Sequence, residues 1–293
     1  MPELPEVETV RQDLRVQLLN KKIKSVTVLN PKTVSASSYD FANILQGTFF
    51  IDILRRGKLL IFKLKRANLY LLAHLKMTGQ LIYLNGNQVS VGGHSLSSDS
   101  YEKSVGGQLP NKHTRIIISF ADKSKLFFND LRKFGYMKIA SQKELDAFII
   151  KNYGPEPLTS DFVLSEFIAK LKTKKRNIKA VLLDQKLVSG LGNIYVDEVL
   201  FAAGVRPMRL ASSVTKSEAA KIYQEIKRIL TLAIKHRGTT FNNYVDAKGH
   251  KGNFSKLLKV YGHSKDKCAK CGSDIIKTKI AGRGTHYCPH CQK

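Results

Sequence analysis

The sequence predicts an α+β protein of several domains: an N-terminal helix with a β-sandwich, then a mainly helical domain, then a cysteine-bearing tail. Three observations predict this class. The chain starts with an amphipathic stretch, continues in short β-branched and aromatic runs as far as Ile139, and has helical periodicity from Phe162 onward. Its 293 residues suffice for about two domains with their own cores. We place the boundaries at residues 1–139, a linker at 140–157, and further domains at 158–257 and 258–293.

The predicted first domain opens with a helix, because Val7, Val10, Leu14 and Leu18 repeat at spacings of three and four. Glycines and serines fill the stretch from Asn85 to Lys112, which predicts a long mobile loop in place of packed structure. Eight short runs predict the strands of a sandwich or barrel: Val26 to Leu29, Thr48 to Leu54, Leu59 to Leu64, Leu69 to Leu75, Gln80 to Leu84, Arg115 to Phe120, Lys125 to Phe128 and Tyr136 to Ile139.

The second half of the chain is predicted to be mainly α-helical. It follows Gly154-Pro155-Glu156-Pro157, a run typical of a linker. The tail returns to two short β-like runs between its cysteines. Helical periodicity covers Phe162 to Leu171, Ile178 to Asp184, Ile194 to Ala203 and Lys216 to Lys235.

The charge of the chain indicates a polyanionic partner. Lys and Arg number 49 against 23 Asp and Glu, which gives a formal net charge of +26. A general lysine bias would produce the same charge but predicts no motifs. The longest apolar run, Leu69 to Ala73, is far shorter than the roughly 20 residues that span a bilayer. The acidic N-terminus is unlike a secretory signal, so we expect a cytoplasmic protein without a membrane partner.

The four cysteines predict a structural zinc site. Cys268 and Cys271 form one C-x2-C pair, and Cys288 and Cys291 form another after sixteen intervening residues. Four thiolates leave no open coordination position, so the predicted zinc is structural; two disulfides or free thiols are the alternatives. The intervening residues are long enough for a hairpin that carries Lys277, Lys279, Arg283 and His286 toward phosphates.

A glycine-rich connection between two predicted helices is a second candidate site. Gly190, Gly192 and Asn193 precede the helix, so backbone N–H groups at the helix start could bind a phosphate, as in a helix-turn-helix-like unit. An ordinary connection capped by Asn193 is the alternative.

The N-terminus is a third candidate site. If Met1 is removed, Pro2 carries a secondary amine with a pKa near 8, and Glu3 and Glu6 lie within one helical turn of it. Such an amine can attack C1′ of a sugar and form an iminium. The plain alternative is that Pro2 and Pro5 start a helix whose dipole favours nearby carboxylates.

Motifs recur from the first residue to the last. They are Met1-Pro2-Glu3-Leu4-Pro5-Glu6-Val7-Glu8-Thr9-Val10, Arg56-Gly57-Lys58, His74-Leu75-x-Met77-x-Gly79, Asp130-x-Arg132-x-Phe134-Gly135, Gly154-Pro155-Glu156-Pro157, Leu191-Gly192-Asn193-Ile194-Tyr195-x-Asp197-Glu198 and Gly282-Arg283-x-Thr285. In this order they resemble the formamidopyrimidine-DNA glycosylase family, bifunctional enzymes that excise oxidised purines. The related endonuclease VIII group usually has Gly at the position of Leu4, so the resemblance is to the purine-directed branch.

The resemblance implies a fold and a mechanism. The helical domain would be a helix-two-turn-helix domain, followed by a four-cysteine zinc finger with one structural zinc. Pro2 would be the nucleophile at C1′, Glu3 the proton donor and acceptor, and Glu6 a supporting residue. Lys58 would lie near the lesion and its phosphate.

It also implies DNA contacts. Met77 and Phe134 would fill the gap left by a flipped base, and Arg132 would hydrogen-bond the orphaned cytosine; read alone, Met77 and Phe134 would belong to the core. Asn193 and Arg283 would bind phosphates around the flipped nucleotide, and His113 would also contact DNA.

We therefore expect a monomeric enzyme that removes 8-oxoguanine and formamidopyrimidines from duplex DNA and cleaves the abasic site by β,δ-elimination. A non-catalytic DNA-damage-binding protein is an alternative, but such a module has no chemical need for Pro2, Glu3 and Lys58. A ribosome- or RNA-associated protein would explain the charge and the zinc but not the N-terminus.

One position departs from the family. Asn242 stands where a Lys or Arg is common, in a loop through Gly249 and Gly252 that is expected to be mobile and to close over the extruded base. We expect Asn242→Lys to raise excision of 8-oxoguanine relative to formamidopyrimidine or abasic substrates, because a charge-assisted contact is restored.

Overall fold

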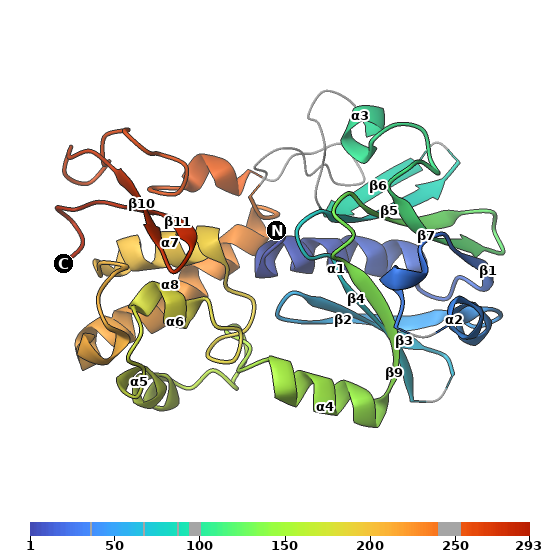
Figure 1. Ribbon diagram of the computed structural model, residues 1–293, viewed down its shortest axis with the longest axis horizontal. Helices are drawn as coiled ribbons and strands as arrows, with labels where there is room; N and C mark the ends of the chain where they lie inside the picture. Colours follow the sequence, from blue (N-terminus) through green and yellow to red (C-terminus); the bar gives the residue numbers. More distant parts are fainter. Residues whose placement is uncertain (36, 67, 87, 94–100, 240–252) are drawn as a thin grey trace. The chain divides into compact units, whose positions relative to one another are not determined.

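The computed structural model describes residues 1–35, 37–66, 68–86, 88–93, 101–239 and 253–293 (Figure 1). The chain forms two compact units. Unit 1 comprises Met1–Lys151 and His236–Asn253, and unit 2 comprises Asn152–Lys235 and Phe254–Lys293. The chain therefore leaves unit 1 after Lys151 and returns to it for a short segment beginning at His236.

Unit 1 is a sandwich of two antiparallel sheets. One sheet has the order β1-β7-β8-β5-β6 and the other the order β2-β3-β4-β9. Apolar side chains of both sheets share one core, as expected when alternate residues of each strand point inward. The strands are β1 (Ile23–Val28), β2 (Phe50–Arg56), β3 (Leu59–Leu64), β4 (Leu69–His74), β5 (Gly79–Asn85), β6 (Gln88–Gly93), β7 (Thr114–Phe120), β8 (Lys125–Asp130) and β9 (Tyr136–Ser141).

Helix α1 (Leu4–Leu18) completes the core of unit 1. Its apolar stripe, which includes Val7, Val10 and Leu14, is buried in the same cluster as the sheets. At Gly92 of β6 a Cβ would lie 2.8 Å from the methyl groups of Val10, so only glycine allows this approach. The predicted N-terminal helix and β-sandwich are confirmed.

The predicted loop from Asn85 to Lys112 was wrong in part. Strand β6 pairs with β5, and helix α3 (Tyr101–Val105) follows it. Side-chain amides hold the last carbonyls of α3: Gln80 donates to Ser104, and Asn111 and Asn129 donate to Val105. The residues of this stretch have a weak propensity for regular structure, but pairing with β5 stabilises β6, and hydrogen bonds from distant residues stabilise α3. The predicted mobility of residues 87 and 94–100 lies outside the described residues.

Besides β6 and α3, three further elements of unit 1 were not predicted. Helix α2 (Ser38–Leu45) begins at Ser37, whose hydroxyl accepts the N–H of Asp40. A short 3-10 helix, η1 (Pro31–Thr33), precedes it. Helix α4 (Gln142–Asn152) lies within the stretch that the sequence suggested as a linker.

Unit 2 consists of helices and a terminal hairpin. Helix α7 packs against α8 and against β11, and α5 packs against α8. No helix among the described residues is long and apolar enough to cross a membrane. The elements are α5 (Leu164–Lys172), α6 (Ile178–Leu182), α7 (Asn193–Ala203), η2 (Ala211–Ser213), α8 (Lys216–Lys235), η3 (Phe254–Leu257), β10 (Ile276–Ile280) and β11 (Arg283–Tyr287).

Candidate active site

Pro2 and Glu3 are buried where helix α1 begins. Glu3 is the N-cap residue, with extended backbone angles (φ −99°, ψ −173°). Its N–H donates to Oε2 of Glu6 at 2.9 Å. A carboxylate at N3 that accepts the N-cap N–H is half of a capping box, and it fixes the direction in which the first residues enter the helix. The capping interaction at the start of α1 therefore fixes Glu3 next to Pro2.

The second oxygen of Glu6 binds the segment that returns from unit 2. Oε1 accepts the N–H of Thr239 at 2.7 Å and its hydroxyl at 3.0 Å. Gly238 precedes it with φ +78°, and a Cβ there would lie 2.7 Å from Oε1. Nη2 of Arg237 lies 2.8 and 2.6 Å from the two carboxylate oxygens of Asp13 on α1. One buried carboxylate therefore joins the chain start to residue 239.

Lys58 lies at the β2–β3 turn and is 4% exposed. Arg55 supports this turn: Nη1 donates to the carbonyl of Gly57 at 3.0 Å, and Nε donates to Glu8 on α1 at 2.9 Å. Burial alone would raise the pKa of Glu8, but hydrogen bonds from Arg11 and Arg55 outweigh it and lower the pKa. Through its bonds to Glu8 and to Gly57, Arg55 therefore connects the β2–β3 turn to helix α1, which begins beside Pro2.

His74 ends strand β4 and is buried. Burial, with the charges of Lys76 and Lys58, lowers the pKa of His74 to about 3, so the imidazole is neutral at physiological pH. Nδ1 accepts the N–H of Lys76 at 3.0 Å. A neutral imidazole that accepts at Nδ1 carries its proton at Nε2, so His74 offers a fixed donor there.

Met77, Arg132 and Phe134 form an exposed cluster on unit 1. Nη1 of Arg132 lies 3.1 Å from the sulfur of Met77, and its guanidinium lies 4.7 Å from the ring centre of Phe134. Met77 is 39% and Phe134 54% exposed, so neither belongs to the core. The residues just before them, Lys76 and Lys133, have left-handed backbone angles (φ +50° and +59°). Such angles are uncommon outside glycine and occur often at functional sites.

His113 precedes strand β7, and its carbonyl accepts the N–H of Asp130 at 2.9 Å. Burial, then the charges of Lys112 and Arg115, lower the pKa of His113. The backbone thus places His113 beside the end of β8, from which the turn with Arg132 continues.

In unit 2, Asn193 is the first residue of α7, and Gly192 is its N-cap. The interpretation of Asn193 as a capping residue was wrong, because its Nδ2 donates to the carbonyl of Gly284 at 2.9 Å. Arg283, the neighbour of Gly284, is exposed. The glycine-rich turn and the terminal hairpin therefore meet at Asn193.

Two acidic residues of α7 lie in the motif that starts at Leu191 but were given no role from the sequence. Asp197 is paired with Lys179. Glu198 accepts the N–H groups of Lys259, Val260 and Tyr261 at 2.8 to 3.1 Å. Burial raises the pKa of Glu198 despite these bonds. The available signal was a pair of adjacent carboxylates inside an otherwise apolar helix. Because buried charges need partners, such a pair indicates bonds to other segments of the chain.

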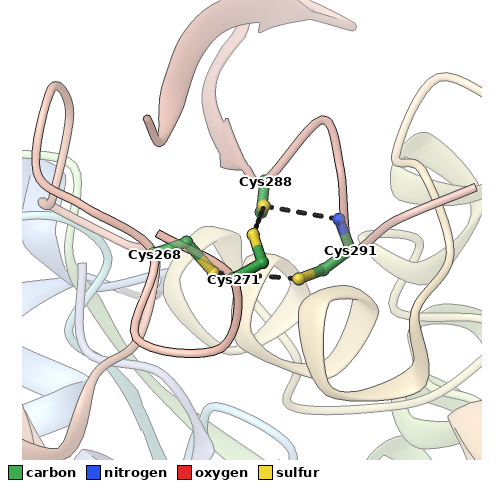
Figure 2. A group of neighbouring side chains, drawn as sticks. All are labelled: Cys268, Cys271, Cys288 and Cys291. Carbon is green, nitrogen blue, oxygen red and sulfur yellow. Dashed lines mark hydrogen bonds between the residues drawn. The ribbon is translucent and has the colours of Figure 1, made fainter. Parts of the chain in front are cut away.

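The four cysteine sulfurs come together, as Figure 2 shows, and all lie within 4.8 Å of one another. The sulfurs of Cys268 and Cys291 are 3.9 Å apart, and those of Cys271 and Cys288 are 3.5 Å apart. A disulfide needs about 2.05 Å, so these cysteines are free thiols by geometry. A tetrahedral zinc with Zn–S bonds of about 2.3 Å needs sulfurs about 3.8 Å apart. The donor set therefore fits zinc.

Comparison with known proteins agrees with this geometry. The N-terminal domain of formamidopyrimidine-DNA glycosylase matches residues 1–137, its H2TH domain matches 153–244, and a zinc finger found in FPG and IleRS matches 265–293. The chain belongs to the formamidopyrimidine-DNA glycosylase family. The resemblance stated from the motifs, the helix-two-turn-helix domain and the cysteine zinc finger are thereby confirmed, and the chain is a DNA glycosylase of this family.

Relatives named formamidopyrimidine-DNA glycosylase match over whole lengths. Those of Carboxydothermus hydrogenoformans and Streptococcus mutans are 40% and 42% identical over 294 residues, with full coverage of both chains. A Lactococcus lactis enzyme variant in complex with DNA containing Fapy-dG has a TM-score of 0.88 at 36% identity, with full coverage of both chains. The same enzyme with DNA containing an abasic site has a TM-score of 0.87, with 99% of each chain covered.

The departure at Asn242 lies outside the described residues, as do Gly249 and Gly252. The expectation that this loop closes over an extruded base therefore stays a prediction.

Proposed function

We propose that this chain removes 8-oxoguanine and formamidopyrimidines from duplex DNA and then cleaves the strand, with Pro2 as the nucleophile. The observation that carries the proposal is the buried start of α1, where Pro2 and Glu3 adjoin and Glu6 bonds both Glu3 and Thr239. The names of the relatives, and the lesions in the DNA of the similar complexes, support this substrate class.

Excision begins with the amine of Pro2 after Met1 is removed. An α-amino group has a pKa near 8, so an appreciable fraction is uncharged at neutral pH. The nitrogen forms a bond to C1′ and loses its proton while the bond from C1′ to the base breaks, and the base leaves with that electron pair and takes up a proton in turn. Glu3 then donates a proton to O4′ as the C1′–O4′ bond breaks, which leaves an iminium between C1′ and Pro2.

Strand cleavage follows from the iminium, which withdraws electrons from the sugar. Loss of a proton from C2′ moves an electron pair toward the iminium and expels the 3′ phosphate oxygen. A second elimination expels the 5′ phosphate, and water hydrolyses the remaining iminium to restore the Pro2 amine. Glu3, now a carboxylate, accepts a proton in these steps, and the ammonium of Lys58 balances the charge of a nearby phosphate.

DNA contacts are assigned to residues away from the nucleophile. Asn193 and Arg283 bind phosphates, and His113 also contacts DNA. Met77 and Phe134 enter the base stack where the lesion is extruded, and Arg132 hydrogen-bonds the orphaned base. The net charge of +26 supports binding through phosphates.

One structural zinc is assigned to Cys268, Cys271, Cys288 and Cys291. Four thiolates would leave the metal no open position, so it would supply folding free energy to the hairpin that carries Arg283 and would take no part in the chemistry.

Borohydride trapping tests the proposal. The protein is incubated with a duplex containing 8-oxoguanine opposite cytosine, reduced, digested and mapped; Pro2→Gly and an undamaged duplex are the controls. We expect a covalent adduct at Pro2 with the damaged duplex alone. An adduct at a lysine, or no adduct with a protein that binds the duplex, would contradict the mechanism.

A further inference from the structure

Asp130, the last residue of β8, has bonds to several segments that carry the proposed DNA contacts. Its side chain is 1% exposed. Its backbone N–H donates to the carbonyl of His113 at 2.9 Å. Its carbonyl accepts Nε and Nη2 of Arg115 at 3.0 and 2.8 Å. The backbone of Asp130 is thus fixed to the start of β7 from both sides.

The carboxylate of Asp130 joins two turns. Oδ2 accepts the N–H of Gly135 at 2.7 Å. Oδ1 accepts the hydroxyl of Thr78 and lies 3.2 Å from the N–H of Arg132. That N–H also lies 3.0 Å from Oγ1 of Thr78. One turn contains Met77, which precedes Thr78, and the other contains Arg132 and Phe134, so the carboxylate fixes one turn against the other.

The second turn has little freedom to move away. A Cβ on Gly135 would lie 2.7 Å from the ring of Phe128 and 3.1 Å from Oδ2 of Asp130. Left-handed backbone angles at Lys76 and Lys133 cost free energy and persist only where surrounding bonds enforce them. The hydrogen bonds that the carboxylate of Asp130 accepts from both turns help to enforce these angles.

We propose that Asp130 is the positioning residue that holds Met77, Arg132 and Phe134 in the arrangement that enters the duplex. This inference rests on the proposed function. Because Arg132 already contacts both Met77 and Phe134, little conformational freedom remains to be lost on binding. Asp130 itself touches no reacting atom, so its loss affects base extrusion and leaves the chemistry at C1′ intact.

The chemistry of the side chain suggests the variants. A carboxylate accepts all of these donors, whereas the amide of an asparagine would offer one oxygen and turn an NH2 group toward a donor. Asp130→Asn is therefore nearly isosteric but breaks the connection. Thr78→Val removes the hydroxyl that donates to Asp130, so it breaks the same connection from the other turn. It replaces Asp130→Asn in the experiment if that variant folds poorly. Asp146→Asn, on the exposed face of α4, is the matched control.

A binding experiment separates the insertion of Met77, Arg132 and Phe134 into the duplex from catalysis. The duplex carries a tetrahydrofuran abasic analogue opposite 2-aminopurine, whose fluorescence reports unstacking of the orphaned base. At saturating protein we expect a smaller fluorescence change for Asp130→Asn and Thr78→Val than for the wild type or Asp146→Asn. Equal changes for all four proteins would overturn the inference. No bond to Pro2 forms here, so a failure of the proposed mechanism leaves this readout intact.

Single-turnover excision separates positioning from general damage to the fold. With 8-oxoguanine opposite cytosine we expect Asp130→Asn to slow excision about tenfold or more. With the same lesion opposite a missing base, which is extruded at lower cost, we expect the rate to recover to within about twofold of the wild type. Equal slowing on both duplexes would mean that Asp130 is merely structural.

Discussion

Lys179 and Asp197 form a completely buried ion pair, with 2.7 Å between Nζ and Oδ1. The other oxygen of Asp197 accepts the N–H of His286 at 2.8 Å. Lys179 also donates to the carbonyl of Gly284 at 3.1 Å, the same carbonyl that Asn193 binds. This pair therefore joins α6, α7 and β11, and it sets the hairpin with Arg283 against the turn that ends at Asn193.

We expect Lys179→Met to lower the free energy of unfolding by about 3–5 kcal/mol, because it leaves the carboxylate of Asp197 buried without its counter-charge. Urea unfolding measures this. Lys170→Met is the control, since Lys170 is an exposed member of an i,i+4 pair and such pairs contribute about 0.3–0.5 kcal/mol. Similar losses for both variants would show that the buried pair is not a main connection of unit 2.

We expect Pro2→Gly and Glu3→Gln to nearly abolish base excision and to leave binding to an abasic analogue largely intact. Chemistry and phosphate binding are assigned to different residues, so they should separate. Single-turnover excision and a binding titration measure the two. An equal loss of binding would contradict that division of roles. Retention of Met1 should block the reaction too, so mass spectrometry that finds Met1 on fully active protein would remove Pro2 from its role.

Local patterns explain what the sequence could predict. The cysteine spacing predicts the cluster because each ligand pair lies on one tight turn. The buried stripe of α1 follows from periodicity alone. The bond from Glu6 to Thr239 joins residues 233 positions apart, and no local pattern in a single sequence indicates such a partner. Strand β6 was missed for a similar reason, since Gly92 fits there because α1 packs on it.

We expect about one zinc per chain, and we expect Cys288→Ser to weaken DNA binding chiefly by unfolding the hairpin that carries Arg283. Metal analysis, circular dichroism and binding titrations measure these effects. Cys288 is fully buried, whereas Ile276 on β10 of the same hairpin is exposed and is assigned no DNA contact, so Ile276→Ser is the control for substitution itself. Metal-free protein that kept a folded tail and full DNA affinity would contradict a structural zinc.

We expect Gly238→Ala to slow excision, because its Cβ would lie 2.7 Å from Oε1 of Glu6 and displace the carboxylate that binds Glu3 and Thr239. A left-handed alanine also costs about 1–2 kcal/mol of stability. Gly47→Ala is a matched control, since Gly47 has φ +79° with nothing within 4 Å of its Cβ position. Both variants should carry the cost of a left-handed alanine in urea, and Gly238→Ala should lose further stability with the displaced carboxylate. Gly238→Ala alone should lose excision rate. Equal excision rates would show that the contact with Glu6 is unimportant.

The low pKa of His74 makes stability depend on pH. The native imidazole binds a proton only near pH 3, whereas the unfolded chain binds one below about pH 6.5. Between these values the unfolded state holds the extra proton, so acid favours unfolding. The contribution of His74 is fully present above pH 6.5 and decreases by about 1.4 kcal/mol per unit as the pH falls toward 3.

The variant His74→Asn isolates this contribution, because Asn cannot titrate but keeps an acceptor for the N–H of Lys76. Urea unfolding at about pH 7.5 and about pH 5.5 gives the change in free energy for each protein. We expect the wild type to lose about 1.4 kcal/mol more than His74→Asn over this range, since the other titrating groups are common to both. The same pH dependence in both proteins would mean that folded His74 takes up a proton over the same pH range as the unfolded chain. The imidazole would then not be held neutral in the folded state.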